Sequence, residues 1–173
     1  MNQLFDRMLR AAKLDSMLYE EVEHDTTATS QAVAVVLLSS VAAGIGSPVG
    51  GGLGMMFTGA IIALVSWFLW SYVVYFIGTR LLPEPQTEAD YGQLLRTIGF
   101  SSAPGVLRVV GFIPFLGWLI GLIASVWMLV AMVVAVRQAL DYRGNGRAIV
   151  VCLIGFVIMF FVNILLGGLF MRP

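Results

Sequence analysis

The chain contains 173 residues, of which 59% are hydrophobic and only 12% are charged, and its mean hydropathy of +0.91 lies outside the range of soluble globular domains. A soluble fold would have too little polar surface, so the composition predicts an all-α integral membrane protein. Ten basic and ten acidic residues give zero net charge, which provides no argument for nucleic acid as a partner.

Residues 1–30 form a cytoplasmic N-terminal segment that precedes the first long apolar stretch. The segment lacks the early apolar run of a signal peptide. On a helical wheel, five of its apolar side chains fall within about 140° of arc, with polar side chains opposite. We therefore expect a short amphipathic helix in the membrane interface, with packing beneath the transmembrane bundle as the alternative. The five side chains are Leu4, Phe5, Met8, Leu9 and Ala12.

The densest polar cluster, YEEVEHD, ends just before the first apolar stretch. In a helix, Glu20, Glu23 and His24 would share one face, and carboxylates beside an imidazole could bind zinc or manganese. Against a metal site, the chain has one histidine and no recognised ligand spacing. We favour a solvated acidic face, or an acidic strip that pairs with basic residues after the fourth span, and we expect no metal or other cofactor. The basic residues are Arg137, Arg143 and Arg147.

A helix needs about 20 apolar residues to cross the hydrocarbon core of a bilayer. Four stretches qualify by length and polarity, and a fifth is long enough although it carries two arginines and a proline. We therefore predict five transmembrane helices that form one domain over residues 31–173. The predicted spans are Gln31–Ser47, Leu53–Gly78, Tyr91–Pro114, Phe115–Val136 and Ala148–Phe170.

The positive-inside rule separates five spans from four, because lysine and arginine collect in cytoplasmic loops. With five spans and a cytoplasmic N-terminus, eight of the ten basic residues are cytoplasmic and the two outer loops carry none. With four spans, the Arg143 loop would face outward. We therefore expect the C-terminus, with Arg172, to lie outside. The eight cytoplasmic residues are Arg7, Arg10, Lys13, Arg80, Arg96, Arg137, Arg143 and Arg147.

The third predicted span contains Arg96, Pro104 and Arg108. Proline removes a helical hydrogen bond, so we expect this helix to break near Pro104. A charge at the bilayer centre costs about 2.5–3.5 kcal/mol, and no predicted span contains Asp or Glu. The available partners are freed backbone carbonyls, lipid phosphate or a ligand anion. We expect Arg96 and Arg108 to reach opposite headgroup layers, Arg108 the outer one, and keep both as lipid or anion contact candidates.

Small residues mark the expected helix contacts. Gly117, Gly121 and Ser125 form a small-xxx-small stripe on the fourth predicted span, and Ser40 and Gly44 repeat the spacing in the first. This spacing lets helices approach closely. We expect the two stripes to pair within the chain, with self-association as the alternative.

The stretch from Tyr91 onward resembles bacterial members of the Yip1 family, and so does LYEEVEHD before the first span. The shared features are a Ser-Ala-Pro break, an Ile-Pro-Phe-Leu-Gly turn and a fourth helix with tryptophan. The resemblance implies a five-helix protein of a bacterial cytoplasmic membrane and adds no active site. Eukaryotic relatives carry an Asp-Leu-Tyr-Gly-Pro motif and are linked to Rab-type GTPases. That motif is absent here, so Rab binding is not expected.

No set of residues in the sequence indicates an enzyme. The only histidine, His24, belongs to no recognised Ser-His-Asp set. The glycines of DYRGNGR mark a turn rather than a phosphate-binding loop. We expect a scaffold or accessory subunit that contacts membrane lipids and binds another membrane protein or a second copy, or organises the bilayer. The alternative is a small channel or a lipid or anion transporter that uses the polar third span. A cavity reaching Arg108 would favour the alternative.

Overall fold

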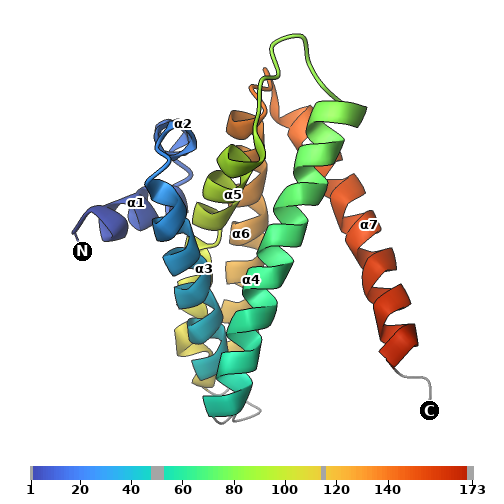
Figure 1. Cartoon of the computed structure of the whole chain (residues 1–173). Helices are drawn as coiled ribbons and strands as arrows, with labels where there is room; N and C mark the ends of the chain where they lie inside the picture. Colours follow the sequence, from blue (N-terminus) through green and yellow to red (C-terminus); the bar gives the residue numbers. More distant parts are fainter. Residues whose placement is uncertain (1, 48–52, 114–115, 171–173) are drawn as a thin grey trace.

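Helices make up all the regular structure in the described parts of the chain (Figure 1). The computed structural model describes residues 2–47, 53–113 and 116–170, so Pro114, Phe115 and Arg172 of the predictions lie outside it. Two elements are not α-helices: the π-helix η1 (Ile77–Leu81) and the 3-10 helix η2 (Ala103–Phe112). The α-helices are α1 (Asn2–Ala12), α2 (Ser16–His24), α3 (Ala28–Ile45), α4 (Leu53–Phe76), α5 (Tyr91–Phe100), α6 (Gly117–Ala139) and α7 (Asn145–Phe170).

Four helices are long and apolar enough to cross a membrane: α3, α4 continued by η1, α6 and α7. They confirm four of the predicted stretches, with α3 beginning at Ala28 instead of Gln31 and α7 at Asn145 instead of Ala148. Large apolar side chains are exposed along all four helices, as expected for helices that face lipid. The chain is therefore an all-helical, multi-pass membrane protein.

The helix in the third predicted stretch breaks before Pro104. The α-helix α5 ends at Phe100, and a 3-10 helix starts at Ala103 with Pro104 in its first turn. Proline has no N–H to donate and disfavours helical geometry at the residue before it. The hydroxyl of Ser101 donates to the carbonyl of Ile98 at 2.7 Å, which competes further with the helical pattern. The predicted break is confirmed.

The segment formed by α5 and η2 runs parallel to α3. A methyl group added at Gly99 would lie 2.7 Å from Cβ of Ala32, and one added at Gly105 would lie 2.0 Å from Oγ of Ser39. Farther along, one at Gly46 would lie 1.8 Å from the carbonyl oxygen of residue 108. Residue numbers therefore increase in the same direction along both segments. The two backbones lie side by side and run in parallel.

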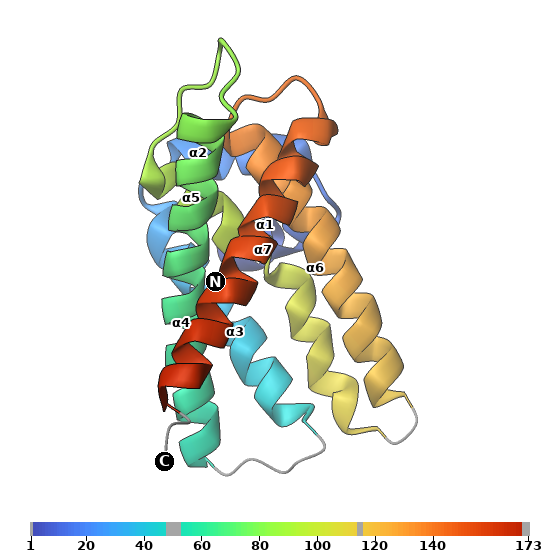
Figure 2. The same cartoon turned by 90° about the vertical axis from the view of Figure 1, so that its right-hand side faces the viewer.

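The 3-10 helix η2 lies between α3 and α6 (Figure 2). A methyl group at Gly117 would lie 2.1 Å from the carbonyl oxygen of Gly111, and one at Gly105 would lie 2.9 Å from Sδ of Met128. Gly121 has open space around it. Ser39 of α3 and Gly117 of α6 thus meet η2, whereas Gly44 of α3 meets Met56 of α4. The predicted pairing of the two stripes is therefore wrong.

The loops 82–90 and 141–144 meet at one end of the bundle, which we call the loop end (top of Figure 1). The hydroxyl of Tyr142 donates to the carbonyl of Leu82 at 2.8 Å. Arg147 forms an ion pair with Glu84 at 3.2 Å. These contacts tie the end of α4 and η1 to the turn between α6 and α7. We call the opposite end, where Gly46, Gly111 and Gly117 meet, the far end.

Candidate functional site

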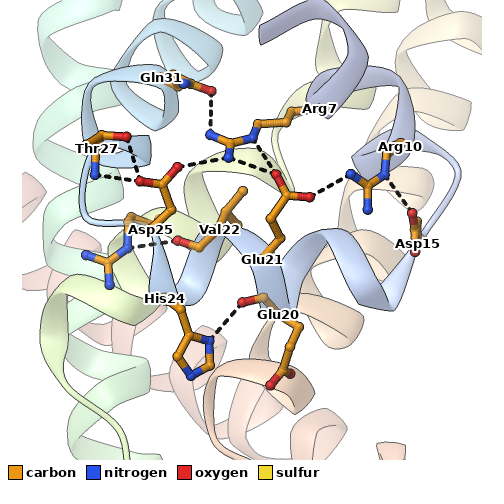
Figure 3. Close-up of polar contacts among 11 residues, drawn as sticks. Arg7, Arg10, Asp15, Glu20, Glu21, Val22, His24, Asp25, Thr27 and Gln31 are labelled. Carbon is orange, nitrogen blue, oxygen red and sulfur yellow. Dashed lines mark hydrogen bonds and ion pairs between the residues drawn. The ribbon is translucent and has the colours of Figure 1, made fainter. Parts of the chain in front are cut away.

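A buried arginine joins α1 to α2 and α3 (Figure 3). The Arg7 side chain is 5% exposed, and its guanidinium donates to Glu21 at 2.9 Å, Asp25 at 2.8 Å and Gln31 at 3.0 Å. Three N–H donors of the planar guanidinium are thus satisfied by α2, by the residue that caps its C-terminus and by α3. Arg7 therefore anchors α1 to the rest of the protein.

A second arginine of α1 extends this network (Figure 3). Arg10 pairs with Glu21 at 2.7 Å and with Asp15 at 2.8 Å, and its hydrogen bond lowers the pKa of the Glu21 carboxyl. Asp15 also accepts the backbone N–H of Met17 and so caps α2. The acidic segment therefore pairs with α1, and the predicted pairing with basic residues after the fourth span is wrong. Those residues were Arg137, Arg143 and Arg147.

The side chains considered as metal ligands do not converge. Glu23 is 2% exposed and one of its oxygens has no hydrogen-bond partner, whereas His24 is exposed and its Nδ1 lies 2.9 Å from the carbonyl of Glu20. Burial, with the nearby carboxylates of Glu20 and Asp141, raises the pKa of Glu23 to about 7. In the ranges that the structure covers, no three His, Cys, Asp or Glu side chains come together to hold a metal ion.

Arg96 is used inside the protein. Its guanidinium donates to the backbone carbonyls of Val22 at 2.9 Å and Glu23 at 3.2 Å, in the last turn of α2. A cation at a helix C-terminus is stabilised by the helix dipole and satisfies carbonyls that lack helical partners. Arg96 is 6% exposed, so its predicted reach to a headgroup layer is wrong. Arg108 remains as the lipid or anion contact candidate.

A cavity of about 500 Å³ opens inside the bundle, with walls from α3, α4, α5, η2, α6 and α7. We call it the central cavity. Its polar lining consists of hydroxyl groups and one guanidinium, contributed by segments that are far apart in the sequence. The polar residues are Ser39, Ser40, Ser66, Ser101, Ser102, Arg108 and Ser125.

Arg108 turns into this cavity. Its guanidinium donates to Oγ of Ser125 on α6 at 2.9 Å, and that hydroxyl in turn donates to the carbonyl of Gly121 at 2.7 Å. Among the described residues, no carboxylate lies within ion-pair distance of Arg108. The expectation that Arg108 reaches the outer headgroups is therefore wrong. The side chain is half-buried, and within the described part of the chain its guanidinium has one hydrogen-bond partner, the hydroxyl of Ser125, although a guanidinium carries five N–H donors.

The remaining walls of the central cavity are apolar and reach the outer surface of the bundle. Leu129 of α6 and Phe156 of α7 line the cavity and are also 43% and 42% exposed. Trp70 packs against Phe156 with ring centroids 4.6 Å apart and donates to Sδ of Met132 at 3.0 Å. The cavity therefore combines one cation, several hydroxyls and a large apolar wall with an opening toward the lipid-facing side.

A family model described as the Yip1 domain matches residues 19–166. The chain belongs to the Yip1 family. No curated protein and no solved structure matches the chain. The Yip1 domain begins in α2 and ends in α7, so it contains every residue of the central cavity. The helix α1, with Arg7 and Arg10, precedes the matched region.

Sequence reasoning singled out Arg108 in this Yip1 domain but missed its surroundings. Ser39, Ser66 and Ser101 carry no signal in the sequence, because isolated serines are common in membrane helices, where they bond to their own backbone. The path of η2 between α3 and α6 brings Arg108 into the cavity that these serines line. The role of Arg7 was also missed, since its partners lie 14 to 24 residues away.

Proposed function

We propose that the protein handles lipids, by accepting the anionic headgroup of a membrane lipid in the central cavity. The observation that carries this proposal is Arg108, which faces the cavity without a carboxylate partner among the described residues. An unpaired cation at membrane depth is costly, and a phosphate group would satisfy its remaining donors with strong, charge-assisted hydrogen bonds.

The size and the walls of the cavity favour an amphiphile over a free anion. A volume of about 500 Å³ falls in the range of small-molecule sites and is too small for a whole phospholipid. The exposed faces of Leu129 and Phe156 offer an exit for acyl chains into the bilayer. A lipid can therefore place its headgroup inside while its chains remain in the membrane.

The bundle fits a lipid-handling role better than the role of a scaffold or accessory subunit. A scaffold predicts a continuously packed interior, whereas the bundle contains a cavity that reaches Arg108. The exposed apolar side chains of the spans are accounted for by lipid and point to no protein partner. The role is also proposed to be non-enzymatic, because the polar lining offers hydroxyls and a guanidinium but no general base.

We propose five passes in a bacterial cytoplasmic membrane, with the N-terminus in the cytoplasm and the C-terminus outside. Two features support a third pass through α5 and η2. These elements run beside α3 in the same direction, and their combined length is about 35 Å, because a 3-10 helix rises farther per residue than an α-helix. A bilayer core of about 30 Å is thereby crossed.

Cysteine labelling tests this topology on a Cys152→Ala background. Cysteines at Ser47 and Arg172 should react with an impermeant maleimide added outside intact cells, whereas cysteines at Gln86 and Asn145 should react only after the membrane is opened. Labelling of the Asn145 position from outside would contradict five passes.

Native mass spectrometry of the purified protein tests lipid binding. The wild type should retain an anionic phospholipid in preference to a zwitterionic one. Arg108→Gln should weaken this retention about tenfold or more, because a hydrogen bond to a charged group contributes about 1.5–3 kcal/mol.

Two further variants make the binding result specific. Arg80→Gln removes an exposed arginine in η1 and should leave retention unchanged. Ser66→Phe places a large ring at the exposed edge of the cavity and should reduce retention while Arg108 stays in place. Equal retention by the wild type, Arg108→Gln and Ser66→Phe would refute the proposed function.

A further inference from the structure

The end of α1 lies beside the middle of a membrane span. Nε1 of Trp127 donates to the carbonyl of Ala12 at 2.7 Å. Trp127 is 12 residues from the end of α6 at Ala139, which corresponds to about 18 Å along the helix. Figure 1 likewise shows α1 at the side of the bundle, below the loop end. The helix α1 therefore does not cap the bundle from beneath.

One edge of α1 and α2 is apolar and exposed. Phe5 is 64% exposed and Leu9, one helical turn later, is 45% exposed. Met17 at the start of α2 is 70% exposed. Leu4 and Met8 pack against the hydrophobic core. The amphipathic helix thus uses its apolar residues in two directions, toward the protein and away from it.

The two arginines of α1 form ion pairs with carboxylates of the same chain. Arg7 pairs with Glu21 and Asp25, and Arg10 pairs with Glu21 and Asp15. Taking an unpaired guanidinium out of water is expensive, and pairing with hydrogen-bonded carboxylates offsets that cost. Ion pairs of this kind lower the cost of placing α1 beside a membrane span, where the surroundings are less polar than water.

We infer that α1 and the start of α2 form a hairpin inserted into the leaflet on the side of the loop end, with acyl chains against Phe5, Leu9 and Met17. The lipid-facing surface continues directly from this edge, because Val126 and Val130, on either side of Trp127 along α6, are 52% and 44% exposed. The contact between Ala12 and Trp127 fixes the depth. This inference is independent of the lipid proposed for the central cavity.

Spin labels test the insertion on a Cys152→Ala background in phospholipid nanodiscs. Nitroxides replace Phe5 and Leu9 on the exposed apolar edge, and Asp6 at a polar, exposed position of the same helix. We expect the first two to be relaxed by oxygen, which concentrates in acyl chains, and the label at Asp6 by a water-soluble nickel chelate. The labels replace exposed side chains, so the packing that holds α1 is left in place.

Two reference positions calibrate the result. A label at Val130 on the exposed face of α6 defines the membrane interior, and a label at the exposed Glu88 in the loop 82–90 defines water. Labels at Phe5 and Leu9 should match Val130 in accessibility. Relaxation of both by the nickel chelate to the extent seen at Glu88 would overturn the inference, and so would equal oxygen accessibility at Phe5 and Asp6.

Discussion

Gly46→Ala should destabilise the protein by about 3 kcal/mol or more, at the upper end of the range for overpacking a close contact. A methyl group at Gly46 would lie 1.8 Å from the carbonyl oxygen of Arg108 and 2.9 Å from its carbon. These are backbone atoms, so no rotamer change relieves the overlap and η2 must move away from α3. Thermal unfolding monitored by circular dichroism should show a large drop in melting temperature.

Gly59→Ala is the matched control. Gly59 lies within α4, and a methyl group there meets nothing within 4 Å. Since alanine favours a helix over glycine by about 1 kcal/mol, this variant should be as stable as the wild type or more stable. Equal melting temperatures for Gly46→Ala and the wild type would show that η2 is not held against α3 as described.

Arg7→Gln should release α1 from the bundle and cost about 1–3 kcal/mol. Removing one partner of a buried ion pair leaves carboxylates uncompensated, and the cost is reduced because Glu21 and Asp25 are 39% and 27% exposed. Hydrogen exchange should show faster exchange of the amides of α1, with α3 to α7 unaffected.

Two further variants separate the effect of the hydrogen bonds of Arg7 from the effect of its charge. Arg7→Lys keeps the charge but offers no planar fork, so it should restore only part of the protection of α1. Arg80→Gln removes an exposed arginine and should change nothing. If Arg7→Gln leaves the exchange of α1 unchanged, the anchoring role of Arg7 is wrong.

Hydropathy predicted the spans because a bilayer imposes length and polarity on every helix that crosses it. The helices α3 and α7 each begin three residues before the predicted start of the span. Their first turns contain polar residues such as Thr29 and Asn145, which join a helix without adding to its hydrophobic signal. The break near Pro104 was also predictable, because proline acts on the local backbone. Neither rule requires knowledge of which helices are neighbours.

The path of η2 could not be predicted in the same way. Small residues on α3 and α6 indicate close approach, but the pattern does not name the partner. Gly105 and Gly111 of η2 supply the complementary surface and place this segment between the two helices. The direction of Arg108 follows from that placement. The tendency of long basic side chains to extend toward lipid headgroups predicted an outward direction for Arg108. The packing of η2 against α6 directs the side chain into the cavity instead.

The ion pairs show a similar limit. Opposite charges on the same membrane side predicted a partnership between the acidic segment and the arginines after the fourth span. The structure satisfies Glu21 with Arg7 and Arg10 instead, because α1 folds back onto α2. Charge inventories therefore predict that pairs form but not which ones.

Solid-state NMR of the protein in phospholipid bilayers tests lipid binding in the central cavity most directly. Dipolar recoupling between guanidinium nitrogen-15 and lipid phosphorus-31 reports arginines in contact with phosphate, and the difference between the wild type and Arg108→Gln isolates one side chain. We predict a lost signal that corresponds to a nitrogen–phosphorus distance of about 4 Å, as in a guanidinium–phosphate hydrogen bond. Identical dephasing in the two samples would contradict the proposal that Arg108 holds a lipid headgroup.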